Sequence, residues 1–149
     1  MKLEKDIKQS RLFESPYQKA TVNLMYTHNW LINEMKSFFD EYEITMKQFN
    51  ILRILKGARK SVSTSYVKER MLDKNSDVSR IVDRMSEKNL INKCVSPKDK
   101  RLVDLSLSVV GDKLLLKINK NLIKMDKVFS NLNSKEVETL NILLDKIRP

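Results

Sequence analysis

The fold of this chain is decided by residues 77–107, which read DVSRIVDRMSEKNLINKCVSPKDKRLVDLSL. The first part of this stretch repeats apolar residues at the spacing of one helix face, namely Val78, Ile81, Val82 and Met85. That spacing predicts an amphipathic helix over 77–88, and Asn89 suits the positive φ that would end it. Polar and apolar residues alternate in the second part, which predicts two short strands at 90–96 and 102–107 joined by a polar hairpin tip.

Two further helices are expected upstream of this stretch. Thr45 and Gln48 have the spacing of a capping box, which predicts a helix that starts there and is closed by Gly57. A shorter helix is expected at about 64–72, before a tight polar turn at 73–75, with Asn75 or Ser76 available to cap the helix that follows. Three short helices followed by a hairpin predict a winged helix-turn-helix over about 44–107.

The flanking segments are expected to be long helices. Ser15-Pro16 is typical of a helix start, so one helix should span about 16–40, after a polar and irregular segment 1–15. Two more are expected within 108–148, the first capped by Ser108 and continuing to Phe129. Their apolar stripes are broader than one small domain can bury, so these helices are expected to need a further partner surface. The predicted class is mainly α with a small β-hairpin wing, in a single domain over 1–149.

The composition restricts the class of partner. The chain has 149 residues and a formal net charge of +10 at pH 7, which favours a polyanion, either nucleic acid or an anionic membrane surface. One cysteine and one histidine exclude an internal disulfide and disfavour a metal site, so we expect no metal and no cofactor. The sequence lacks a signal-peptide pattern and a run of about 18 apolar residues, which predicts a cytoplasmic protein without a membrane partner.

Two groups of residues are expected to contact double-stranded DNA. Hydroxyls near a helix start suit phosphate or base contacts, and arginine suits guanine or phosphate. The predicted contacts from the reading helix are Ser76, Asp77, Ser79, Arg80 and Arg84. Those from the wing are Lys98, Asp99, Lys100 and Arg101. Each feature alone is also typical of a solvated surface, but their order along the chain favours DNA binding.

The sequence resembles the MarR-type transcriptional regulators. ITMKQFNIL at 44–52 resembles the opening of the family's second helix, and DVSRIVDRM at 77–85 its recognition helix. Asp99-Lys100-Arg101 matches the D-x-R of the wing, and SVVG at 108–111 resembles the T-x-x-G that opens the next helix. The resemblance implies that Arg101 enters the minor groove, that Asp99 orients it or pairs with a helix arginine, and that the helices at 16–40 and 108–148 form the dimer.

Many members of that family respond to a small aromatic effector. The residues that would line an effector cleft here are Tyr17, Tyr26, His28, Trp30 and Met35. Aromatic residues at helical spacing more often pack in a core or an interface, so both roles stay open. Cys94 falls in the first wing strand, where a structural role is favoured over a reactive thiolate.

The expected function is a homodimeric repressor that binds a pseudo-palindromic operator. No glycine-rich phosphate loop, H-E-x-x-H motif or nucleophile elbow is found, so an enzyme is not expected. Two alternatives are a winged helix that binds proteins and a basic protein of the membrane surface. The first would lack a basic reading helix, and the second would need a basic helix with an exposed apolar face.

Overall fold

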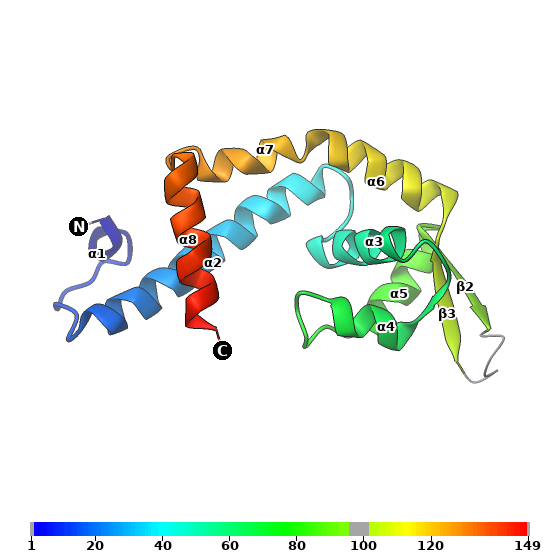
Figure 1. Ribbon diagram of the computed structural model, residues 1–149, viewed down its shortest axis with the longest axis horizontal. Coiled ribbons are helices and arrows are strands. Elements are labelled where there is room, and N and C mark those ends of the chain that lie inside the picture. The colour runs from blue at the N-terminus through cyan, green and yellow to red at the C-terminus, as the bar shows by residue number, and fades with distance from the viewer. Residues whose placement is uncertain (1, 96–101, 149) are drawn as a thin grey trace.

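A computed structural model describes residues 2–95 and 102–148 (Figure 1). In chain order its elements are α1 (Lys2–Asp6), α2 (Pro16–Asp40), α3 (Met46–Ala58), β1 (Val62–Ser63), α4 (Thr64–Arg70), α5 (Val78–Glu87), β2 (Ile91–Val95), β3 (Val103–Leu107), α6 (Val109–Asn121), α7 (Ile123–Asp126), η1 (Lys127–Phe129) and α8 (Ser134–Ile147). The predicted class, mainly helical with a small antiparallel sheet, is confirmed.

The helices begin where local capping chemistry starts them. The Ser15 hydroxyl accepts a hydrogen bond from the Gln18 amide at 3.1 Å, with Pro16 in the first turn of α2. Thr45 and Gln48 form the predicted capping box of α3, with bonds of 3.2 and 2.9 Å. These side chains satisfy backbone N–H groups that lack a partner in the first turn of any helix.

The sheet has the strand order β1-β3-β2 and is antiparallel throughout. In the hairpin Ile91 pairs with Leu107 and Val95 with Val103, which confirms two paired strands close to the predicted segments 90–96 and 102–107. Asn89 has φ 56°, the left-handed conformation expected between α5 and β2. The two-residue strand β1 was not predicted, because so short a segment has no periodicity of its own.

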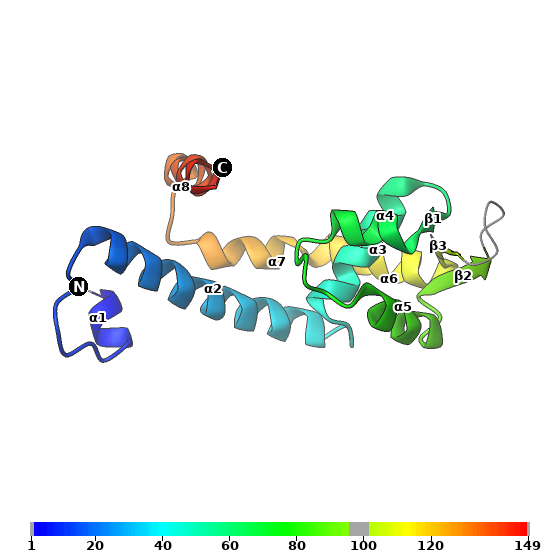
Figure 2. The same ribbon diagram turned by 90° about the horizontal axis from the view of Figure 1, so that it is seen from below.

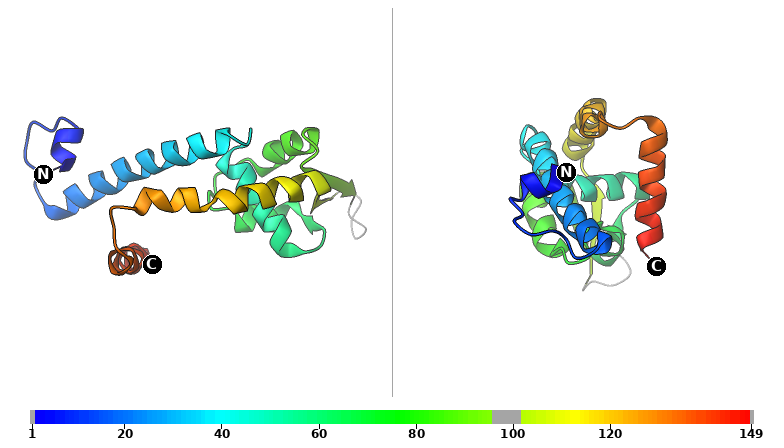
Figure 3. Two further views of the ribbon diagram at one scale, coloured as in Figure 1. Left: turned by 90° about the horizontal axis from the view of Figure 1, so that it is seen from above. Right: turned by 90° about the vertical axis from the view of Figure 1, so that its left-hand side faces the viewer.

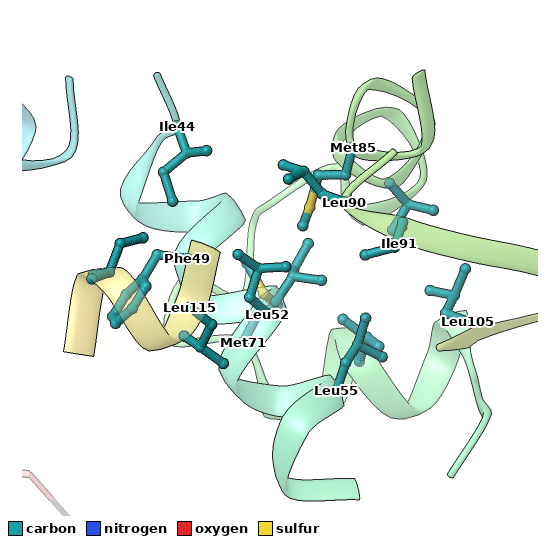
Figure 4. Close-up of a cluster of buried hydrophobic side chains, with 14 of the residues drawn as sticks. Ile44, Phe49, Leu52, Leu55, Met71, Met85, Leu90, Ile91, Leu105 and Leu115 are labelled. Carbon is teal, nitrogen blue, oxygen red and sulfur yellow. The ribbon is translucent and has the colours of Figure 1, made fainter. Parts of the chain in front are cut away.

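One hydrophobic core joins α3, α4, α5, the hairpin and α6 (Figure 4). Its fully buried side chains include Ile51, Leu52, Val67, Met85, Leu105 and Ile118. Gly111 lets α6 approach the start of the hairpin, since a Cβ there would lie 2.0 Å from the Leu90 carbonyl oxygen. This core holds α5 and the wing as one lobe.

Outside this lobe, α2, α7 and α8 extend to the opposite end of the molecule (Figures 2 and 3). Along its 25 residues α2 buries only Phe38 and Phe39. The apolar side chains left exposed at this end include Leu24, Met25, Tyr26, Trp30, Ile123, Phe129, Ile142, Leu143 and Ile147. Within residues 2–95 and 102–148, no helix combines the length and the apolar character that crossing a membrane requires.

Three details of the sequence prediction are wrong. The helix α3 continues through Gly57 and ends where Arg59 adopts φ 55°, because a single left-handed residue can be other than glycine. The N-terminal segment contains α1, which is held on α2 by the buried Leu3 and by an ion pair of 2.7 Å between Glu4 and Lys19. The predicted helix from 108 to 129 is divided into α6, α7 and η1.

Candidate nucleic-acid interface

The helix α5 presents one apolar face to the core and one polar face to solvent. Val78, Val82 and Met85 are 3%, 2% and 0% exposed, whereas Ser79, Arg80 and Arg84 are exposed on the other side. Arg80 and Arg84 are one helical turn apart and point from the same face. In the part of the chain that the structure describes, neither guanidinium forms an ion pair. The two arginines are therefore available to an external anion.

The first residues of α5 have structural roles that the sequence analysis did not assign to them. Asp77, not Asn75 or Ser76, is the N-cap, and its Oδ1 accepts a hydrogen bond from the Arg80 amide at 3.2 Å. Ser76 is buried at 5% exposure, so this conformation does not present its hydroxyl to a ligand. Five residues were predicted to contact DNA from this helix. Three of them, Ser79, Arg80 and Arg84, have exposed side chains that do not cap the helix.

The turn between α4 and α5 is fixed by a carboxylate that sequence reasoning missed. Asp73 Oδ2 lies 2.7 Å from Lys47 Nζ at the start of α3, and Asp73 Oδ1 accepts the Asn75 amide at 3.0 Å. The hydrogen bond from Lys47, and then that from Asn75, lower the pKa of Asp73 below its ordinary value of 3.8. The sequence predicted a polar turn here. It did not predict the ion pair, because Lys47 precedes Asp73 by 26 residues and no local spacing connects the two.

A second missed pair links α5 to the wing. Lys93 Nζ on β2 lies 2.5 Å from Asp83 Oδ1, and both side chains are partly exposed. The predicted wing contacts Lys98, Asp99, Lys100 and Arg101 lie outside the described residues. Their assignment therefore stays a prediction, although β2 and β3 end on either side of them (Figure 1).

The five residues predicted to line an effector cleft do not converge on one pocket. Tyr26 and Trp30 line a cavity of about 620 Å³ with residues of α1 and η1. His28 lines another pocket, between α2 and α8. Tyr17 is 83% exposed, and Met35 packs against the core of the lobe.

A different pocket, of about 400 Å³, lies where the C-terminal half of α2 meets α3 and α5. Its apolar walls come from Ile32, Phe39, Ile44, Met46 and Ile81. Its charged lining groups are three cations and one carboxylate: Lys36, Lys47, Arg84 and Asp40. Apolar walls with an excess of cations suit a small organic anion. Because Arg84 belongs to α5, an occupant would touch the reading helix directly.

Part of the chain is similar in sequence to known proteins. Residues 44–103 match the model of the MarR family. The HTH-type transcriptional repressor MdtR of Bacillus subtilis (strain 168) is 38% identical over 79 residues, which are 53% of this chain and 50% of that protein. The chain thus aligns with about half the length of this curated relative.

The fold of most of the chain is similar to that of solved structures. A MarR variant from E. coli in complex with operator DNA has a TM-score of 0.76 at 22% identity, covering 85% of this chain and 91% of that one. BpsR of Bordetella bronchiseptica, described with regulation of its DNA binding by 6-hydroxynicotinic acid, has a TM-score of 0.76 at 19% identity and coverages of 88% and 99%. Residues 44–103 are therefore similar to the MarR family, and the chain as a whole has the fold of these solved structures.

Proposed function

We propose that this protein is a transcriptional repressor that binds double-stranded operator DNA as a homodimer. The observation that carries the proposal is the outward pair Arg80 and Arg84 on α5, whose other face is locked into the core. A helix braced in this way fits the major groove, and two arginines one turn apart can contact guanine edges or phosphates. The net charge of +10 supplies long-range attraction to DNA.

Two relatives support the regulatory role. MdtR is named a transcriptional repressor, and the E. coli MarR variant was solved with operator DNA. A dimer that covers a promoter blocks the polymerase without further machinery, so repression is the sign of regulation that we propose. A protein of this kind acts on the chromosome, so we expect it in the cytoplasm, and we expect it to have no enzymatic activity.

The exposed apolar residues of α2, η1 and α8 support the homodimer. Trp30, Phe129 and Ile142 are exposed, and the helical segments that carry them extend to the end of the molecule away from the lobe (Figure 3). An apolar surface of this kind is typical of a protein interface, and a twofold axis through it would present two α5 helices to successive major grooves. Sedimentation equilibrium tests this, and a monomer at micromolar concentration contradicts it.

The DNA proposal is tested by fluorescence anisotropy. The protein is titrated onto a labelled duplex taken from the region upstream of its own gene, with a scrambled duplex of equal composition in parallel. We expect preference for the native duplex, two chains per site and a steep decrease of affinity with salt. Because an operator can lie elsewhere, selection of bound duplexes from a random pool follows. Equal and weak affinity for every selected sequence contradicts the proposal.

We further propose that a small aromatic anion regulates this binding from the pocket between α2, α3 and α5. The walls Phe39 and Ile81 suit an aromatic ring, and Lys36 and Arg84 suit a carboxylate. BpsR, whose DNA binding is regulated by an aromatic acid, has the same fold. This position replaces the one predicted from the aromatic residues of α2.

A further inference from the structure

The outward face of α5 carries an acid between its two arginines. Asp83 is three residues after Arg80, so these two side chains are neighbours on the helix surface, and it directly precedes Arg84 in the chain. Its side chain is 58% exposed. A carboxylate in this place would repel the phosphates that the arginines are proposed to meet, unless a cation accompanies it.

Lys93 is that cation. Its Nζ lies 2.5 Å from Asp83 Oδ1, and its side chain is 35% exposed. Lys93 is in the middle of β2 and opposite Leu105 of β3, so its backbone is held by the hairpin ladder. The ammonium therefore reaches α5 from a fixed strand and not from a free loop.

The same pair also ties two elements whose covalent connection is short. Between α5 and β2 the chain reverses through Asn89, where the Leu90 amide donates to the Met85 carbonyl at 2.9 Å. The pair from Asp83 to Lys93 is a second tie across this reversal, farther along β2 toward the wing tip. With the backbone hydrogen bond alone, the hairpin could rotate relative to α5. The additional ion pair restricts this rotation.

We propose that Lys93 is a positioning residue for operator recognition, which neutralises Asp83 and sets the wing at a fixed angle to the reading helix. The proposal rests on the DNA-binding function proposed above. Exposed ion pairs add little to global stability, so the pair acts on recognition rather than on folding. Its loss should therefore separate affinity and sequence preference from thermal stability.

Four variants test this: Lys93→Met, Lys93→Arg, Asp83→Asn and, as control, Lys88→Met. Lys88 is on the same lobe, and its Nζ donates to the Glu43 carbonyl at 2.7 Å, so its removal costs one charge without exposing a carboxylate. All four are compared with the parent for operator affinity, affinity for a scrambled duplex and melting temperature. Hydrogen exchange of the β2 and β3 amides is measured without DNA.

Lys93→Met should lower operator affinity about tenfold, since it leaves a like charge against the phosphates, and should speed exchange in the hairpin. Lys93→Arg should restore both, and Lys88→Met should change affinity less. Asp83→Asn should raise affinity for the scrambled duplex and reduce the preference for the operator. The melting temperature should stay within a few degrees throughout.

Two results overturn the inference: a Lys93→Met protein with parental exchange in the hairpin, or one whose operator preference equals that of the parent. Failure of Lys93→Arg to rescue would also contradict it. Failure of the proposed function is a separate outcome, recognised when the parent prefers no duplex. Hydrogen exchange still decides in that case whether Lys93 and Asp83 hold the wing.

Discussion

Gly111 and Leu90 approach each other so closely that a Cβ on Gly111 would lie 2.0 Å from the Leu90 carbonyl oxygen. That carbonyl also accepts the Ser108 amide at 3.3 Å, so it cannot move without disturbing the start of α6. The contact ties the start of α6 to the residue that immediately precedes β2. It explains why position 111 is a glycine although it lies inside a helix, where glycine is otherwise unfavourable.

Gly111→Ala should therefore destabilise the protein by about 3 kcal/mol, because backbone rather than a flexible side chain must shift. Gly57→Ala is the matched control, since a Cβ at this other helical glycine would meet nothing within 4 Å. It should stabilise the protein by up to about 1 kcal/mol. Urea unfolding followed by circular dichroism measures both, and equal effects of the two changes would contradict the assigned contact.

The stability of the lobe should depend on Asp73 at acid pH. Its folded-state pKa is lowered, first by the hydrogen bond from Lys47, below the ordinary value of 3.8. A lowered pKa contributes stability that is complete above the unfolded pKa and is lost as the pH falls through the folded one. Asp73→Asn should flatten the decrease in unfolding free energy below about pH 4. Lys47→Met should do the same. If neither variant changes the slope of unfolding free energy against pH, the ion pair does not contribute to acid sensitivity.

Arg80→Ala should weaken operator binding by about 1–3 kcal/mol, as expected for an arginine that contacts a base edge or phosphate. Lys127→Ala is the control, because Lys127 is exposed on η1, outside the lobe, and its removal changes the net charge equally. Anisotropy on one operator duplex at fixed salt compares the two. A loss no larger than that of Lys127→Ala would exclude Arg80 from the reading face.

Arg101→Ala should weaken DNA binding strongly while leaving the dimer intact. The expectation comes from the D-x-R pattern of the wing, in which arginine is drawn to the negative potential of the minor groove. Operator affinity and sedimentation are measured on the same preparation. A folded variant that binds its operator as tightly as the parent would show that the wing assignment is wrong.

The position of the proposed effector pocket can be tested with benzoate and its neutral analogue benzamide. Benzoate should bind and weaken operator affinity, and Lys36→Met should reduce this response because it removes one cation from the pocket. Asn23→Ala changes the separate cavity that Tyr26 and Trp30 line and should leave the response unchanged. Isothermal titration without DNA gives the binding constants. A response lost in Asn23→Ala and kept in Lys36→Met would move the site to the other cavity.

Features with local physical causes can be predicted from the amino-acid sequence. Ser15, Thr45 and Ser108 each cap a helix from a distance of three residues, and these starts were predicted correctly. The change from helical to alternating period located α5 and the hairpin. Arg80 and Arg84 were recognised as an outward pair because the helix repeat alone places them opposite Val78 and Val82.

Features that join distant parts of the chain depend on how the helices and strands pack. The Lys47 ammonium meets Asp73, and Lys93 meets Asp83, because the core brings α3, α5 and β2 together. The pocket beside Arg84 likewise exists only where α2, α3 and α5 converge, so the aromatic pattern of α2 gave no sign of it. Local sequence spacing determines the face of the helix on which a side chain lies. Its partner across the fold is set by packing, which no local spacing encodes.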